Sequence, residues 1–140
     1  MPVDRSLPLA ERARIERRFR HAVNLSAAEI AAHLGTEASR AVGFRYPGER
    51  ESVGRQSARA IIRLLTEGPR TDDDWRHMRK VAGYVARHLA QRPSGDVHGS
   101  RWRASLMNWG HDPTIGKQGT VGAAKVRRWA PSPRHRALHR

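Results

Sequence analysis

The sequence contains no cysteine, which excludes disulfide bonds and metal sites built from thiolates. It contains no apolar run long enough to cross a membrane, and its first residues, MPVDRSLPLAER, include no apolar segment of signal-peptide length. We therefore expect a cytoplasmic protein. Aromatic residues make up only 6% of the 140 residues, so the core must consist mainly of alanine, leucine, isoleucine and valine, with four tryptophans as its largest members.

Lysine is scarce, and acidic residues are unevenly placed. Only three of the 27 basic residues are lysines, and the net charge is +14. Residues 113–140 contain seven basic residues and no acid, which is half of the surplus. A genome rich in G and C would also raise arginine over lysine, but such a net charge repels itself unless anions are near. Nucleic acid, an anionic membrane surface and an acidic protein are the candidate partners.

No long alternating pattern of the kind found in strands is present, and apolar residues recur at helical spacing. Ser26 and Glu29 form a capping-box pattern, and Thr71 precedes three aspartates that suit the first turn of a long helix. Trp102, Leu106 and Trp109 recur as on the buried face of a last short helix. We predict an all-α, compact bundle of about five helices, with an N-terminal basic helix in residues 1–23, a helical domain in 24–112 and a disordered basic tail in 113–140.

Two of the predicted helices carry basic stripes. Arg55, Arg59 and Arg63 are spaced by four in the helix expected at 54–66, and no acid occurs between Glu51 and Glu67. In the helix expected at 72–91, four further bases lie off the core face: Arg76, Arg79, Lys80 and Arg87. A solvated helix face is the alternative, but we expect these side chains to contact the phosphates of DNA.

The stretch LSAAEIAAHLGTEASRAVGFR has the spacing of a helix-turn-helix, with Ala31 in the first helix and Gly35 in the turn. Arg40 and Arg45 would then point outward from a recognition helix. Two ordinary packed helices are the alternative, because the second helix is short.

The C-terminal segment has further candidate phosphate contacts, namely Lys117, Lys125, Arg127 and Arg128. Trp129 lies among them, and an aromatic ring between bases can stack on an unpaired nucleobase. An electrostatic arm without stacking is the simpler interpretation, and we favour it.

No motif predicts an enzyme. His77 and His88 are eleven residues apart, about three helical turns, which is too far for one metal ion. GHDPTIGKQ does not match a phosphate-binding loop, because five residues separate its glycines and Gln118 replaces the required serine or threonine. We expect no metal and no cofactor.

Three stretches, ESVGRQSARAIIRLL, DDDWRHMRKVAGYVARHLAQRP and SRWRASLMNWGHDP, resemble a family of small microbial proteins with a domain of unknown function. The resemblance covers about residues 24–113, and members of that family are often labelled DNA-binding proteins. Ala58 departs from the pattern, which often has glycine there. Besides Met78, Arg79, Lys80 and Arg87, the matching positions are His77, Gly83, Tyr84, His88, Gln91, Trp102, Asn108, Trp109, His111 and Asp112.

Together these features predict a non-enzymatic DNA-binding protein, nucleoid-associated or related to transcription, that mainly contacts the phosphate backbone. One alternative is an RNA- or ribosome-associated factor, because RNA accepts the same arginines. Another is a protein-interaction module that uses the Trp102–Trp109 segment as a docking surface.

Overall fold

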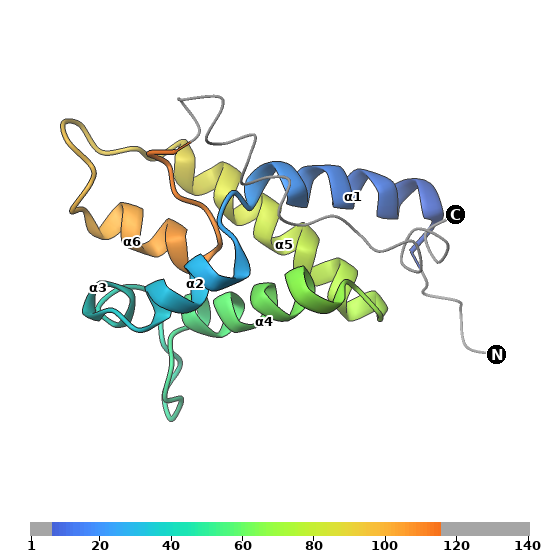
Figure 1. Cartoon of the computed structure of the whole chain (residues 1–140), viewed down its shortest axis with the longest axis horizontal. Helices are drawn as coiled ribbons and strands as arrows, with labels where there is room; N and C mark the ends of the chain where they lie inside the picture. Colours follow the sequence, from blue (N-terminus) through green and yellow to red (C-terminus); the bar gives the residue numbers. More distant parts are fainter. Residues whose placement is uncertain (1–6, 116–140) are drawn as a thin grey trace.

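The computed structural model describes residues 7–115, and these residues form an all-α fold with no strand (Figure 1). The fold class is therefore as predicted. The disordered tail was predicted from residue 113, but residues 113–115 form a turn in which Thr114 donates to Asp112 and Ile115 packs against the core. The rest of the tail, from residue 116 onward, lies outside the described residues. The helices are α1 (Leu9–Ala22), α2 (Ala27–Leu34), α3 (Glu37–Arg40), α4 (Val53–Glu67), α5 (Asp72–Leu89) and α6 (Arg101–Asn108).

The predicted start signals of α2 and α5 are both formed. Ser26 Oγ accepts a hydrogen bond from the backbone N–H of Glu29, and the Glu29 carboxylate accepts one from the backbone N–H of Ser26. Thr71 and Asp74 make the same reciprocal pair at the start of α5. Each pair satisfies backbone donors that a helix leaves free at its first turn.

The helices pack in two pairs, with α1 along α5 and α2 along α4, and α6 contacts α2, α3, α4 and α5 (Figure 1). Three of the four tryptophans predicted for the core are buried, namely Trp75, Trp102 and Trp109, and the fourth, Trp129, lies outside the described residues. Leu89, the last residue of α5, remains 36% exposed. The largest fully buried apolar side chains are Phe19, Ile30, Ile61, Leu64, Met78, Leu106 and Val81.

The buried face of α4 includes one arginine of the predicted basic stripe. Leu64 is fully buried, whereas Ile62 and Leu65 are only partly buried. Arg55, predicted on the solvent face, is 8% exposed. It lies one helical turn before Ala58, which is itself fully buried, so it shares the inner face of the helix.

The predicted helix-turn-helix is wrong. α3 contains four residues and ends at Arg40, so it has about one turn and is too short to lie along a major groove. Arg45 is in the loop that follows rather than on a recognition helix. Ala31 is exposed and does not make the tight crossing that the motif requires.

In the described part of the chain, no helix combines the length and the apolar composition that crossing a membrane requires.

Candidate nucleic-acid interface

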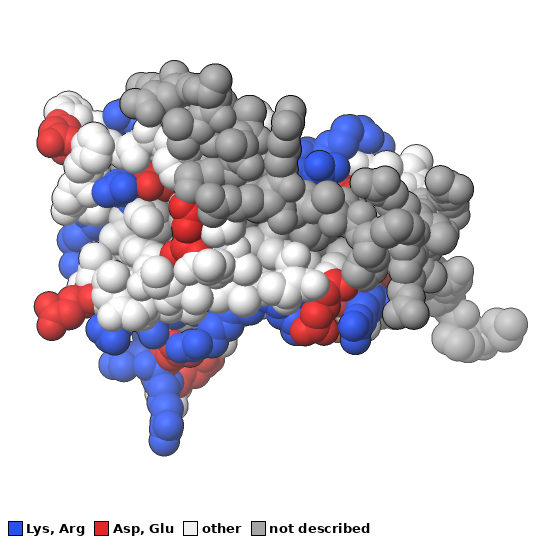
Figure 2. Space-filling view, viewed as in Figure 1, with Lys and Arg blue, Asp and Glu red and all other residues white. Residues whose placement is uncertain are grey.

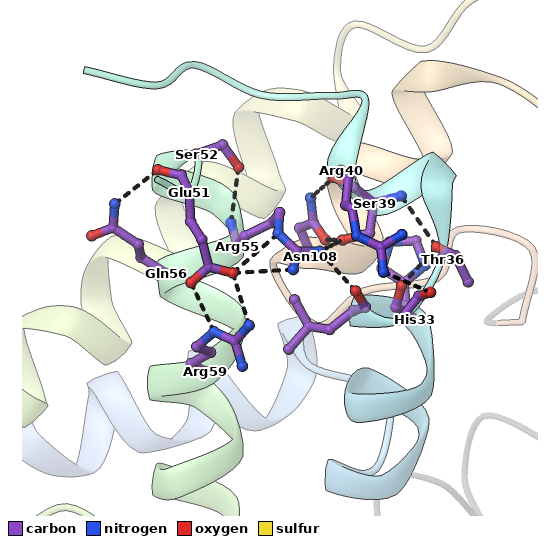
Figure 3. A network of polar contacts seen from close by, with 12 residues as sticks. His33, Thr36, Ser39, Arg40, Glu51, Ser52, Arg55, Gln56, Arg59 and Asn108 are labelled. Atoms are coloured by element: carbon purple, nitrogen blue, oxygen red, sulfur yellow. Dashed lines mark hydrogen bonds and ion pairs between the residues drawn. The ribbon is translucent and has the colours of Figure 1, made fainter. Parts of the chain in front are cut away.

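Arg55 is the centre of a polar network between α2, α3, α4 and α6 (Figure 3). Its Nη1 donates to the backbone oxygen of Leu34 at 2.8 Å and to Ser39 Oγ at 2.7 Å. Ser39 Oγ in turn donates to Asn108 Oδ1 at 2.6 Å. The Arg55 guanidinium is thus used to connect four helices, and it has little surface left for an external anion.

Glu51 accepts from two of the stripe arginines at once (Figure 3). Arg59 donates to both carboxylate oxygens at 2.8 Å, and Arg55 Nε donates to one of them at 3.2 Å. These contacts lower the pKa of Glu51, chiefly through the hydrogen bond from Arg59. Glu51 therefore stays ionised and neutralises part of the stripe.

Three other helix-face arginines, Arg63, Arg76 and Arg79, also have carboxylate partners, whereas Arg87 has none among the described residues. Arg63 binds Asp74 at 2.7 Å across α4 and α5. Arg76 binds Asp73 at 3.0 Å, one turn earlier on α5, and Arg79 binds Glu11 of α1 at 2.8 Å. The expectation that these stripes lack neutralising groups of their own is wrong, because the acids come from other elements or from the first turn of α5.

Three arginines near the loop between α3 and α4 remain available. Arg40, Arg45 and Arg50 are exposed, and none of them forms an ion pair with a carboxylate among the described residues. They line a polar pocket of about 710 Å³, to which Glu51 and Arg55 also contribute. Arg40 uses one N–H to reach the backbone oxygen of Gly35 at 3.2 Å, which leaves its other donors for the pocket.

This loop projects from the body of the molecule beyond α4, and basic side chains gather on it in the face that Figure 2 shows (Figures 1 and 2). Gly43 and Gly48 both have positive φ, 92° and 84°, which lets the chain turn sharply at each. The backbone N–H of Val53 donates to the Phe44 oxygen at 2.7 Å and joins the two ends of the loop. This hydrogen bond holds together the two ends of the loop, which line the pocket.

Lys80 and Arg87 are a second pair of available cations. Both are exposed on α5 and seven residues apart, so they lie on the same side of the helix, and neither has an ion pair among the residues described. The remaining predicted contacts, Lys117, Lys125, Arg127 and Arg128, lie outside the described residues.

Five of the motif residues form a continuous stack of rings that joins α5 to α6. Trp109 stacks on Tyr84 with centroids 4.2 Å apart, Tyr84 on His88 at 5.1 Å, and His88 near Trp102 at 6.2 Å. His77 lies at the other end, 6.3 Å from Trp109. All these pairs are within about 20° of parallel, so these residues serve mainly to pack the two helices together.

The NWGHDP segment fastens the end of α6 to the corner between α1 and α2. Asn24 donates to the backbone oxygen of Asp112 at 2.9 Å and accepts from its N–H at 2.8 Å. His111 contacts the Ala22 oxygen at 2.6 Å through Nδ1. Burial alone would raise the pKa of Asp112, but hydrogen bonds from Arg103 and Thr114 outweigh it and lower that pKa to about 2.

The model of a family of proteins of unknown function, DUF3140, matches residues 18–107. The chain belongs to this family. Neither a curated protein nor a solved structure was found to match it. The DUF3140 segment contains the basic pocket, the loop and most of the ring stack, whereas Trp109, His111 and Asp112 follow it.

The motif histidines of this DUF3140 protein lie in packed surroundings. Burial lowers the pKa of His77, and its Nε2 is 3.0 Å from Ser57 Oγ. In the described part of the chain, no three histidine, aspartate or glutamate side chains converge as metal ligands. Of the other motif positions, Gly83 faces only the end of the Arg87 side chain, and Gln91 lies exposed just after α5.

Two features of the site were not predicted from the sequence. Arg50 was not selected because it lies in a turn without periodicity, and Phe44 and Tyr46 were not selected for the same reason. The available signal was the pair of aromatic residues on either side of Arg45 in a segment with Gly43, Pro47 and Gly48, where no helix or strand can bury them.

Proposed function

We propose that this protein binds DNA without catalysing a reaction on it, mainly through the phosphate backbone, in the nucleoid or in transcription. The observation that carries the proposal is that Arg40, Arg45 and Arg50 line one polar pocket and none of them is ion-paired with a carboxylate among the described residues. Glu51, which also lines the pocket, is paired with Arg55 and Arg59. Guanidinium groups donate to phosphate oxygens in pairs, so three of them around one hollow suit a nucleic-acid backbone.

The charge distribution supports a polyanion as the partner. The described residues carry a net charge of +7, and the segments outside them carry the other half of the +14. Neutralising phosphates with such side chains releases counterions, which gives affinity and a strong dependence on salt but little dependence on sequence. Lys80, Arg87 and the basic residues after 115 would add contacts of the same kind.

The internally paired arginines have a different part in this proposal. Arg59, Arg63 and Arg79 are 43–57% exposed, but each is already neutralised by a carboxylate, so we expect them to add little to DNA binding. Arg55 is too buried to contact a phosphate and lines the pocket instead.

RNA is the second candidate partner, because its phosphates suit the same pocket. The third candidate, docking of a protein on the Trp102–Trp109 segment, loses its support. Both tryptophans are below 10% exposed, and the indole N–H of Trp102 donates to the backbone oxygen of His88 at 2.7 Å.

Binding of the full chain to labelled duplex DNA, single-stranded DNA and RNA of one sequence, followed by fluorescence anisotropy, tests the proposal. We expect DNA affinity to fall steeply as salt rises, with the DNA recovered intact, and RNA to bind more weakly. Replacing Arg40, Arg45 and Arg50 with glutamine should weaken binding to all DNA sequences alike. Lack of DNA binding at low salt contradicts the proposal, and stronger binding to RNA favours the alternative.

The contribution of the C-terminal segment is measured in the same assay. A full-length variant with Lys117, Lys125, Arg127 and Arg128 changed to glutamine keeps the described fold intact and removes four charges. We expect this tail variant to bind DNA less tightly than the wild type. We also expect the loss of affinity caused by replacing Arg40, Arg45 and Arg50 to remain measurable in the same assay. If the tail variant alone abolishes binding, the pocket is not the main contact.

A further inference from the structure

The α3–α4 loop exposes two aromatic rings beside its arginines. Phe44 is 61% exposed and Tyr46 is 55% exposed. The other large apolar side chains that are exposed in the described residues, Leu9 and Leu89, are aliphatic and lie on helices. Aromatic rings of this size usually contribute to a core, so their presence on a projecting loop indicates a contact outside the chain.

The loop holds these rings in place. The Phe44 and Tyr46 rings contact each other edge to face, with centroids 4.6 Å apart and planes at 90°. Besides the Val53–Phe44 hydrogen bond, the N–H of Glu49 donates to the Tyr46 oxygen at 3.1 Å across the Pro47–Gly48 turn. A Cβ on Gly43 would lie 3.2 Å from Ser52, so the two ends of the loop are tightly packed. The rings are thus presented in one arrangement before any partner binds.

The rings share their loop with cations of the pocket. Arg45 lies between them in the sequence and lines the pocket together with Arg40 and Arg50. A nucleotide carries a negative phosphate and an aromatic base a few bonds apart. A loop that carries both guanidinium groups and exposed aromatic rings therefore suits both parts of a nucleotide chain.

We propose that the α3–α4 loop recognises unpaired bases of DNA by stacking Phe44 and Tyr46 on them, while Arg40, Arg45 and Arg50 bind the adjoining phosphates. This inference rests on the proposed function and adds to it the form of DNA that the site prefers. In a duplex the faces of the bases are covered by their neighbours, so rings that stack gain contact only where bases are unpaired. Stacking tolerates any base, so no sequence preference follows.

Two single-stranded oligonucleotides of equal length test the inference, one of thymidines and one with the same phosphates but abasic sugars. The two have equal charge, so phosphate contacts cancel in the ratio of their affinities. We expect the wild-type chain to bind the base-bearing strand more tightly by roughly 5- to 100-fold, as one stacked base provides. Replacing Phe44 and Tyr46 with alanine should bring the ratio close to one and leave the affinity for the abasic strand unchanged.

Matched variants separate stacking from other effects. Tyr46→Phe keeps the ring and should keep the ratio, whereas Tyr46→Leu should lower it. Leu89→Ala removes an exposed apolar side chain elsewhere and should change neither affinity. Thermal unfolding of the Phe44 and Tyr46 variants should match the wild type, because these side chains are more than half exposed, whereas Leu89→Ala can lower the unfolding temperature because Leu89 is only 36% exposed.

The results distinguish the inference from the proposed function. Salt-dependent binding of both strands with a ratio near one in the wild type overturns stacking and leaves phosphate binding intact. An equal loss on both strands when the rings are replaced also overturns stacking, because the rings then support the pocket rather than touch bases. Absence of binding to either strand at low salt overturns the proposed function itself.

Discussion

At the scale of single residues, a charged side chain is understood from its partners rather than from its place in the sequence. Arg55 and Arg59 are one turn apart on α4 and share Glu51. Arg55 is 8% exposed and also donates to Leu34 and Ser39, whereas the side chain of Arg59 is 57% exposed. Arg55 therefore has a structural role, whereas Arg59 belongs to an ion pair at the surface.

Replacing these two arginines separately with methionine tests this difference. Arg55→Met leaves a buried carbonyl oxygen and hydroxyl without a donor, so we expect the free energy of unfolding to fall by about 2–4 kcal/mol. Arg59→Met should lower it by less than about 1 kcal/mol, because exposed pairs contribute little. Denaturant unfolding measures both, and equal effects would show that the Arg55 network does not stabilise the fold.

At the scale of elements, two helical glycines that look alike in the sequence have opposite surroundings. A Cβ on Gly54 of α4 would lie 3.1 Å from Trp109 Nε1 and 3.5 Å from Asn108 Cβ. A Cβ on Gly83 of α5 would lie 3.1 Å from the end of the Arg87 side chain, which is exposed and can move. Close packing requires glycine only at the first position.

The alanine variants should therefore differ in sign. Gly83→Ala should raise the free energy of unfolding by about 0.5–1 kcal/mol, because alanine favours helix over glycine. Gly54→Ala should lower it by about 1–3 kcal/mol, since Trp109 is held in the ring stack and cannot move away easily. Thermal or denaturant unfolding of the two variants decides the point. If Gly54→Ala stabilises the protein as well, the α4–α6 contact is looser than described.

At the scale of the whole molecule, buried and half-buried histidines couple folding to pH. Burial lowers the pKa of four of them below its ordinary value of 6.5, namely His33, His77, His88 and His111. Below about pH 6.5 the unfolded chain binds protons at these positions and the folded chain does not. The contribution of these histidines to the free energy of unfolding is therefore complete above about pH 6.5 and decreases as the pH falls below it.

Asp112 extends the loss to lower pH. The pKa of Asp112 is about 2 in the folded protein, against an ordinary value of 3.8. Its contribution to the free energy of unfolding is therefore present above about pH 4 and is lost as the pH falls towards 2. Unfolding in denaturant at a series of pH values should give a free energy that declines from pH 7 to 5 and again below 4. A constant value between pH 7 and 5 would contradict the neutral, buried state of the histidines.

The sequence was sufficient for the features that depend on neighbouring residues. Capping pairs such as Ser26–Glu29 and the three aspartates in the first turn of α5 are local patterns, and the structure confirms them. It was insufficient for partners that are distant in the chain, such as Glu11 with Arg79, 68 residues apart. A basic stripe that has no acid nearby in the sequence can still be neutralised in space, so the stripes of α4 and α5 were overestimated.

The site was predicted only in part for a related reason. Arg40 and Arg45 were selected from a helix-turn-helix spacing that the chain does not form, and they are nevertheless exposed beside the pocket. Arg50, Phe44 and Tyr46 belong to a loop whose shape depends on positive φ at Gly43 and Gly48 and on the contact with Ser52. No periodic pattern encodes such a shape, so these residues became evident only in three dimensions.

The central claim is that the arginines at the α3–α4 loop, which have no carboxylate partner, bind DNA phosphates, whereas the carboxylate-paired arginines of α4 and α5 add little. The most direct test compares two full-length triple variants that each lose three charges, R40Q/R45Q/R50Q on the loop and R59Q/R63Q/R79Q on the helices. The measured quantity is the slope of the logarithm of DNA affinity against the logarithm of salt concentration, which changes by about 0.9 for each duplex phosphate contact. We predict that the loop variant reduces the slope by roughly 2–3 and the helix variant leaves it nearly unchanged. An equal reduction in both variants, or a larger one in the helix variant, would contradict the account.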